Sequence, residues 1–122
     1  MEIASVADLD RLLEKHRLVV IDYHASWCGP CKAYSPKFNR LDREMRRAVP
    51  QGSFAFVSAD IDRARDLAAL ARVKSVPTTV GFRMGRSLFG RPTRKEVLRF
   101  SGDRPWNDLV RSFADALSRL AT

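Results

Sequence analysis

The sequence predicts an α/β fold in which a central mixed β-sheet is flanked by helices on both faces. Short β-branched apolar runs alternate with helical segments in a β-α-β order, which favours parallel strands joined by right-handed crossovers. A Gly- and Pro-containing stretch between the last two runs is typical of a β-hairpin and predicts an antiparallel pair. The chain has 122 residues, 45% of them hydrophobic, so it can bury a core without crosslinks. We therefore expect a single domain over residues 1–122.

The first half of the chain is expected to form a helix, a strand and a second helix. A capping serine with an acid in the first turn predicts a helix over residues 6–17. The apolar run 18–21 is too short for a helix and predicts a strand that is buried on both faces and ends at Asp22. Helix formers over residues 30–48 predict the second helix, with a kink at Pro36.

The second half is expected to contain three strands and two helices. Residues 53–59 predict a strand, and a short helix should follow around Leu67. Residues 76–80 and 97–100 predict two further strands, and residues 83–94 between them predict the hairpin.

The C-terminal segment is expected to form a helix that packs on the sheet. Asp103 is the candidate N-cap, and Pro105 stands in the first turn. An apolar stripe at helical spacing begins with Trp106, Leu109, Val110 and Phe113.

The composition is strongly basic, with a formal net charge of +8. Six cations and one acid give the segment 83–99 a local net charge of +5, which makes it an extended basic hairpin. Such a cluster attracts acidic proteins, anionic membrane surfaces or nucleic acid, although most clusters of this kind are simply solvated. Binding of nucleic acid is not favoured, because the cations are not interleaved with several aromatic residues. The candidates for binding an acidic protein are Arg86, Arg91, Arg94 and Lys95.

Neither a membrane span nor a targeting segment is evident. No apolar run approaches the length of a span, and the N-terminus has neither a signal-peptide run nor an Arg-rich, acid-poor presequence. We therefore expect no membrane partner and a cytoplasmic protein, with an organelle as the alternative if a leader was removed. In a reducing compartment a lone Cys-x-x-Cys pair is more often catalytic than structural.

All thiol chemistry in this chain is confined to Cys28 and Cys31, its only cysteines. A disulfide between them closes a ring over two residues and restrains the unfolded chain very little, so a structural crosslink is not expected. Zinc requires four ligands, and only His16 and His24 are available besides the cysteines, so no metal is expected. This spacing at a helix start favours a reactive, reversible disulfide.

The position of the pair predicts how it reacts. Cys28 is nearest to the helix N-terminus, and we expect it to be the more exposed sulfur and the attacking nucleophile. Cys31 would then attack the mixed disulfide and release the reduced substrate. Asp22 ends an apolar strand, where burial would raise its pKa and let it exchange a proton with Cys31 through water. The alternative is a strand-end acid that simply reaches solvent.

Five features follow one another along nearly the whole chain: Asp22, the hexapeptide Trp27–Lys32, Pro36, Val76–Thr78 and Gly102. In this order and spacing they resemble the thioredoxin family, whose active-site hexapeptide is Trp-Cys-Gly-Pro-Cys-Lys. The resemblance implies a thioredoxin fold and a dithiol–disulfide oxidoreductase that reduces protein disulfides. It implies no bound cofactor, only a redox-active Cys28–Cys31 disulfide that a reductase recharges with electrons from NADPH. Its substrates would be disulfide-containing proteins such as peroxidases or reductases.

The resemblance also implies roles for residues beside the cysteines. Pro30, together with Gly29, sets the start of the helix and favours a reductant, since disulfide-oxidising relatives typically carry histidine in place of this proline. By itself the sequence favours an ordinary proline at a strand start, after a trans bond. The resemblance instead implies a cis bond between Val76 and Pro77 that packs against the disulfide, where the backbone of Val76 can pair with an extended substrate. Trp27 is expected on the apolar face where partners dock, with a place in the core as the alternative.

Three departures from the family pattern are particular to this chain. His24 stands where many relatives have an aromatic residue, so it would either pack as a buried neutral ring or titrate near Asp22 and Cys31. Ser58 replaces a lysine close to the buried acid, which would make Asp22 easier to protonate. The connection 85–102 is longer than in the bacterial-type pattern and carries the basic cluster. Two other functions stay open: a disulfide oxidase or isomerase, and a binding module that holds an acidic partner by its basic hairpin.

Overall fold

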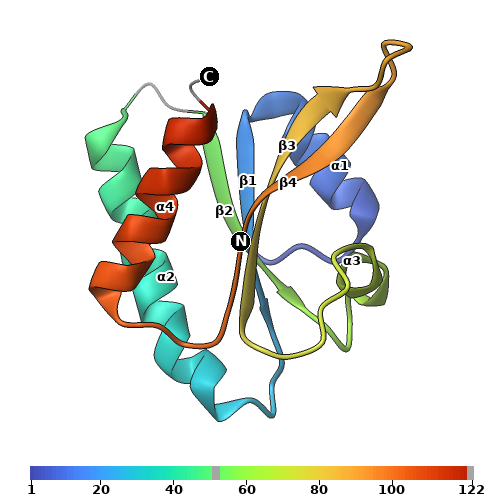
Figure 1. Ribbon diagram of the computed structural model, residues 1–122. Coiled ribbons are helices and arrows are strands. Elements are labelled where there is room, and N and C mark those ends of the chain that lie inside the picture. Colours follow the sequence, from blue (N-terminus) through green and yellow to red (C-terminus); the bar gives the residue numbers. More distant parts are fainter. Residues whose placement is uncertain (51–52, 121–122) are drawn as a thin grey trace.

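Four strands form a mixed sheet at the centre of the computed structural model, which describes residues 1–50 and 53–120 (Figure 1). In chain order they are β1 (Leu18–His24), β2 (Phe54–Asp60), β3 (Thr78–Arg86) and β4 (Pro92–Ser101). Their order across the sheet is β2-β1-β3-β4. β1 and β2 are parallel, whereas β3 is antiparallel to both of its neighbours, β1 and β4. The mixed sheet predicted from the sequence is therefore confirmed.

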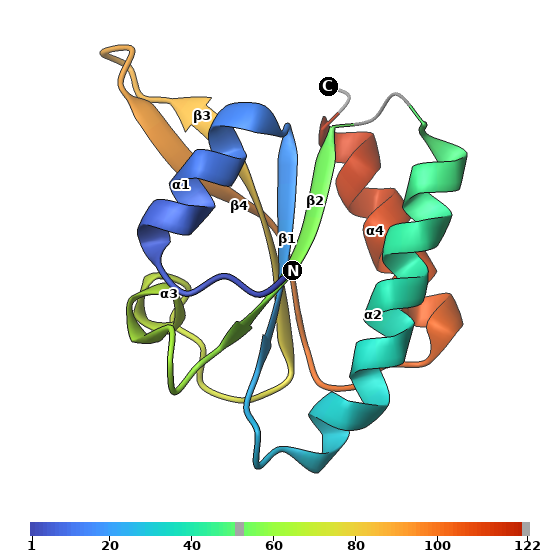
Figure 2. The same cartoon turned by 180° about the vertical axis from the view of Figure 1, so that it is seen from behind.

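Helices cover both faces of this sheet, as Figures 1 and 2 show from opposite sides. α1 (Val6–Lys15) and α3 (Arg65–Leu70) lie on one face, and α2 (Gly29–Ala48) and α4 (Trp106–Leu120) lie on the other. α1 has the predicted cap, because the hydroxyl oxygen of Ser5 accepts the N–H of Asp8 at 3.2 Å. α2 runs through Pro36 without ending. Within residues 1–50 and 53–120 no helix is long and apolar enough to cross a membrane.

The alternation of side chains along β1 divides the core into two layers. The layer beneath α1 and α3 contains Ile21 and Tyr23, and the layer beneath α2 and α4 contains Leu18 and Val20. Successive side chains of a strand point to opposite faces of the sheet. Asp22 therefore lies on the same face as Val20, which is the face that α2 covers.

Two strand boundaries near the predicted site differ from the expectation. β1 continues to His24, so Asp22 lies inside the strand rather than at its end. β3 begins at Thr78 rather than at Val76, because Pro77 has no N–H to donate to a sheet ladder. Val76 and Pro77 therefore form a loop that leads into a central strand.

The parallel pairing in the sheet consists of one complete pair of strands and one isolated bridge. The crossover through α2 joins β1 and β2 along the full length of both strands. On the other side of β2, the N-terminal segment contributes a single parallel bridge between Glu2 and Ser58. The chain turns into α1 at Val6, so this segment adds no further ladder.

The last helix also begins later than the capping pattern predicted. α4 starts at Trp106, so Asp103 is not its N-cap. The Asp103 carboxylate instead accepts a hydrogen bond from the ammonium group of Lys37 at 2.8 Å. Val110 was expected in the apolar stripe but is 43% exposed, whereas its neighbour Leu109 is fully buried. The buried face of α4 is therefore narrower than the stripe in the sequence.

β3 and β4 form a ribbon that projects beyond the rest of the sheet (Figure 1). β3 pairs with β1 only as far as Phe82, so residues 83–86 pair with β4 alone. The sequence predicted a hairpin over residues 83–94, and in the structure most of this stretch is strand, with residues 87–91 as the turn. The predicted basic hairpin is therefore a two-stranded antiparallel ribbon.

Candidate active site

The two cysteines form a disulfide at the N-terminus of α2. Cys28 is the N-cap residue, and its sulfur accepts the N–H of Cys31 at 3.2 Å. Pro30 stands in the first turn, where its missing N–H removes no helical hydrogen bond, and this explains why the helix begins here. The positive end of the helix dipole therefore lies at Cys28, an arrangement that stabilises a thiolate.

Both cysteines are almost completely buried in this oxidised form. Cys28 is 4% exposed and Cys31 is 5% exposed, so the predicted difference in exposure is not observed. The two residues pack in a small apolar cluster with Ala25, Ile61 and Val76. A partner must therefore bring its own sulfur to a disulfide in an apolar environment.

The loop before β3 lies against the disulfide. The Val76–Pro77 peptide bond is cis, as the resemblance implied, and the carbonyl oxygen of Val76 lies 3.6 Å from Cys28 Sγ. Gly102, which follows β4, donates its N–H to the carbonyl oxygen of Pro77 at 2.7 Å. Because β3 begins only at Thr78, the backbone of Val76 stands beside the sulfur and outside the sheet ladder.

Trp27, Gly29 and Pro30 are exposed next to the buried sulfurs. Trp27 is 69% exposed, so the alternative of a core position is wrong. The indole Nε1 of Trp27 donates to Oδ2 of Asp62 at 2.9 Å, which holds the ring at the edge of the site. Asp62 was missed from the sequence. Asp62 follows β2 just as Trp27 follows β1, and the carboxyl ends of parallel strands lie at the same edge of a sheet. These matching positions were the signal in the sequence that could have found the pair.

Asp22 is a buried carboxyl group on the face of the sheet that α2 covers. It is 4% exposed, and its Oδ1 has no hydrogen-bond partner among the described residues. Burial raises the pKa of Asp22 from 3.8 to about 6, while His24 lowers this pKa and Glu2 raises it. The alternative of a strand-end acid that reaches solvent is therefore wrong. Because α2 also carries Cys31, the carboxyl group and the disulfide lie on the same side of the sheet.

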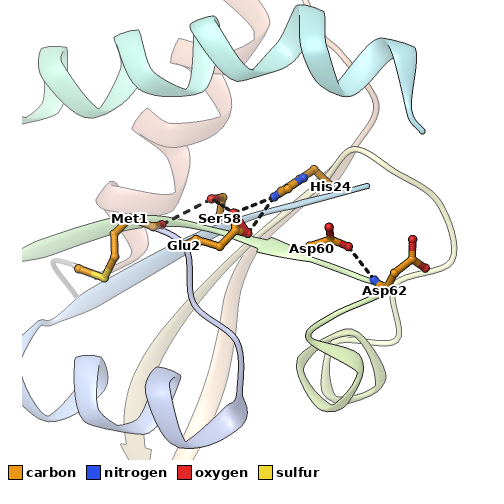
Figure 3. A network of polar contacts seen from close by, with 6 residues as sticks. All are labelled: Met1, Glu2, His24, Ser58, Asp60 and Asp62. Atoms are coloured by element: carbon orange, nitrogen blue, oxygen red, sulfur yellow. Dashed lines mark hydrogen bonds and ion pairs between the residues drawn. The ribbon is translucent and has the colours of Figure 1, made fainter. Parts of the chain in front are cut away.

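Glu2, His24 and Ser58 form a polar network on this same face (Figure 3). His24 Nε2 lies 2.9 Å from Oε2 of Glu2, and Ser58 Oγ donates to Oε1 of Glu2 at 3.0 Å. The His24 side chain is 27% exposed and lies within hydrogen-bond distance of Glu2, so its interpretation as a buried packing residue is wrong. Ser58 lies directly opposite Asp22 in the β1–β2 register. Glu2 was missed, because a contact across 22 residues leaves no local signal in the sequence.

The cations predicted to bind a partner lie on the β3–β4 ribbon and not at the disulfide. Figure 1 shows the ribbon at the end of the sheet opposite to the start of α2. Arg94 is already engaged, because its guanidinium donates two hydrogen bonds to Asp10, at 2.6 and 2.9 Å. Arg86 Nη1 donates to the carbonyl oxygen of Gly90 at 2.9 Å. The fold therefore separates the basic cluster from the redox centre.

A disulfide at a helix N-terminus, packed against a cis-proline loop on an α/β sheet, defines a protein that exchanges thiols and disulfides. In the part of the chain that the structure describes, no three His, Cys, Asp or Glu side chains are grouped so that they could hold a metal ion.

Comparison with known proteins identifies the family. Residues 2–113 match the family model described as Thioredoxin, and the chain belongs to the thioredoxin family. It is 33% identical over 84 residues to thioredoxin of Mycoplasmoides gallisepticum, covering 69% of this chain and 78% of that protein. Thioredoxin-2 of Dictyostelium discoideum is 40% identical over 85 residues, covering 70% of this chain and 89% of that protein. The X-ray structure of Fasciola hepatica thioredoxin matches with a TM-score of 0.73 at 33% identity, covering 94% and 97% of the two chains.

Family membership settles the class of activity. Thioredoxins are thiol–disulfide oxidoreductases that use their own dithiol and no bound cofactor. They typically interact with a thioredoxin reductase and with disulfide substrates such as peroxiredoxins. The fold, family and enzyme class predicted from the sequence are therefore confirmed.

Proposed function

We propose that this protein reduces disulfide bonds in other proteins, with Cys28 as the attacking thiolate and Cys31 as the resolving thiol. The observation that carries the proposal is the place of Cys28 at the N-cap of α2, where the N–H of Cys31 already donates to its sulfur. The helix dipole and this hydrogen bond both stabilise the thiolate. Pro30 adds no charge that would stabilise the thiolate further, which favours a reductant over an oxidase.

The reaction consists of two exchange steps. The Cys28 thiolate attacks one sulfur of a substrate disulfide, which forms a mixed disulfide and expels the other substrate sulfur as a thiolate. Cys31 then loses its proton and attacks the sulfur of Cys28, which forms the Cys28–Cys31 disulfide and expels the second substrate sulfur as a thiolate. Two electrons pass from the protein dithiol to the substrate. The protein is left in the oxidised form that the structure describes.

Asp22 is proposed to accept the proton that Cys31 loses. With a pKa of about 6, Asp22 is mostly ionised near neutral pH yet readily protonated, as a general base requires. Its Oδ1 has no partner among the described residues, which leaves it able to accept a proton or a water molecule. A water molecule between Asp22 and Cys31 would carry the proton from the thiol to the carboxylate.

The substrate is proposed to dock on the exposed residues around the disulfide. Trp27 offers a large apolar ring, and a Cβ placed on Gly29 would meet no atom within 4 Å, so a substrate backbone can approach closely. The backbone of Val76 stands outside the ladder, with its carbonyl oxygen 3.6 Å from Cys28 Sγ. An extended substrate segment can pair with this backbone as an added strand.

The partners that we infer are an NADPH-dependent thioredoxin reductase and proteins with reducible disulfides. One similar solved structure, with a TM-score of 0.68 and 25% identity, concerns the thiol resolving mechanism in yeast mitochondrial 1-Cys peroxiredoxin via glutathione/thioredoxin systems. A thiol peroxidase is therefore the first substrate to test. The cytoplasm is the proposed compartment, since reducing conditions keep such a pair available for repeated turnover.

Two measurements test this function. Cys31→Ser should accumulate a mixed disulfide between Cys28 and the substrate, visible by mass spectrometry and released by dithiothreitol, whereas Cys28→Ser should form none. The reduction potential of the wild-type couple is expected near about −270 mV, and a value near about −180 mV or higher would indicate an oxidase or isomerase instead. A pair that fails to cycle reversibly would overturn the redox function altogether.

A further inference from the structure

The turn of the β3–β4 ribbon exposes two large apolar side chains. Leu88 is 100% exposed and Phe89 is 92% exposed. The turn that carries them is held by hydrogen bonds from the N–H of Ser87 to the oxygen of Arg91 at 2.8 Å and from the N–H of Gly90 to the oxygen of Ser87 at 3.0 Å. Apolar side chains that an ordered turn holds in water are stabilised only when another molecule or a membrane buries them.

Behind this apolar tip the ribbon carries cations without acidic partners. Residues 83–95 contain five cations and no acid, and of these Arg94 is paired with Asp10. Arg83 and Lys95 stand directly opposite each other in the β3–β4 register. Like charges at opposite positions destabilise a sheet, so an anion bound between them would relieve their repulsion. The other four cations of residues 83–95 have no ion pair within residues 1–50 and 53–120. We call these four residues the basic collar: Arg83, Arg86, Arg91 and Lys95.

Two contacts bring cations of the basic collar towards the apolar tip. Cε, Cδ and Cγ of Lys95 would lie 2.7, 2.8 and 3.0 Å from a Cβ placed on Gly85, so the absence of a side chain on Gly85 lets the Lys95 stem lie across it. Gly85 is nearer the turn than Arg83, and the stem of Lys95 therefore leans towards the tip. Arg86 Nη1 donates to the carbonyl oxygen of Gly90 at 2.9 Å, which holds this guanidinium across the turn.

We propose that this ribbon binds anionic lipid bilayers, with Leu88 and Phe89 inserted below the headgroups and the basic collar on the lipid phosphates. A bilayer accepts a convex apolar tip without a preformed pocket, and each Lys or Arg near its surface adds attraction to anionic lipids. A stable interface with an acidic protein buries about 800 Å² per partner, which a narrow turn does not supply. Nucleic acid is bound through several stacking aromatic residues, and the ribbon contains only Phe89.

Binding in this mode leaves the redox centre free to react. β3 runs from Thr78, next to the loop that touches Cys28, to Arg86 at the turn. At about 3.3 Å per strand residue, the tip lies roughly 30 Å from the disulfide loop. The prediction of no membrane partner was based on the absence of a spanning segment, which does not bear on surface binding. No residue of the basic collar belongs to the redox site, so lipid binding does not depend on the disulfide chemistry.

Cosedimentation with lipid vesicles tests the proposal. The full chain should bind vesicles of phosphatidylcholine with one third phosphatidylserine and should not bind phosphatidylcholine alone. Near-molar salt should weaken the binding, because it screens the basic collar. Leu88→Ser/Phe89→Ser should lower the partition coefficient roughly tenfold or more. Arg83→Gln/Lys95→Gln should lower it about 25-fold, at about fivefold for each charge.

The matched control is Arg63→Gln/Arg65→Gln, which removes the same net charge at exposed positions in and next to α3. It should bind within about twofold of the wild type. All three variants should keep the wild-type circular dichroism and rate of reduction of an aromatic disulfide, which shows that they fold.

Three outcomes would overturn the proposal. The first is failure of the wild type to bind phosphatidylserine vesicles, or an equal loss of binding in the matched control. The second is undiminished binding by Leu88→Ser/Phe89→Ser, which would show that the two side chains do not insert into the bilayer. The third is tighter salt-sensitive binding to an acidic protein or to duplex DNA than to vesicles, which would assign the ribbon to that class of partner.

Discussion

His24 Nε2 lies 2.9 Å from Oε2 of Glu2, and this pair stands at the face of the sheet in which Asp22 is buried. It brings an imidazole ring and a second carboxyl group to the surroundings of one buried carboxyl group. Burial raises the pKa of Asp22, His24 lowers it and Glu2 raises it. Two partly exposed residues therefore influence the proton of a group that solvent barely reaches.

The first prediction concerns this control of Asp22. His24→Gln should raise the pKa of Asp22 above its value of about 6, because it removes the ring whose electrostatic effect lowers this pKa. Glu2→Gln should lower the same pKa, because it removes a like charge. Carbon-13 NMR titration of the Asp22 carboxyl group measures both shifts. Shifts in the same direction in the two variants would contradict the electrostatic explanation.

The buried acid should make the protein less stable as pH rises. The pKa of Asp22 is 3.8 ordinarily and about 6 in the folded state, so the folded state holds this proton more tightly than the unfolded state does. The free energy of unfolding therefore falls as pH rises through this window, by about 3 kcal/mol in total.

Asp22→Asn removes this effect. Urea unfolding should show that the variant is more stable than the wild type by an amount approaching about 3 kcal/mol well above pH 6. The two proteins should be about equally stable well below pH 3.8, where the carboxyl group is neutral in both states. A variant that is less stable than the wild type at high pH would show that burial of the ionised Asp22 carboxyl group does not destabilise the folded state.

A buried hydrogen bond between α2 and β3 supplies a further prediction. Tyr34 OH lies 2.7 Å from Thr79 Oγ1, and both residues are buried. Tyr34→Phe leaves the hydroxyl group of Thr79 without this partner and should lower the free energy of unfolding by about 1–2 kcal/mol. Thr79→Val should have a similar effect, and the double variant should lose less than the sum of the two. Strict additivity in denaturant unfolding would mean that this bond contributes no coupling energy.

Gly102 is required by its backbone conformation. Its φ is +86, and its N–H donates to the carbonyl oxygen of Pro77 in the loop beside the disulfide. A side chain is strained in this region, so Gly102→Ala should lower stability by about 1–2 kcal/mol. Gly102→Asn is the matched control, because asparagine tolerates positive φ, and it should cost less. Equal losses in thermal unfolding would point to a cause other than the backbone conformation.

Local patterns explain why much of the active site was predictable. A helix start depends on its own capping residues, so the spacing of Cys28, Pro30 and Cys31 was enough to place the pair at an N-terminus. The apolar run that begins β1 likewise indicated a buried strand. The same run made burial of Asp22 one of two alternatives, and the structure decided between them.

Boundaries and partners were predicted less well, because they depend on distant residues. The β3–β4 ribbon is longer than expected, because β3 and β4 continue to pair with each other beyond the last residue of β3 that pairs with β1. Asp103 looked like a cap in the sequence, but it accepts the ammonium of Lys37, 66 residues away. The place of His24 was decided by Glu2, which no pattern in the sequence connected with it.

The sequence by itself determined the mixed α/β fold and the reactive pair, because hydrophobic periodicity and helix capping act over a few neighbouring residues. Only the tertiary structure decided which charges meet. It pairs Arg94 with Asp10 across 84 residues and leaves Arg83 opposite Lys95. Electrostatic energy depends on the distance between charges in space and on their burial, and neither quantity can be read from spacing along the chain.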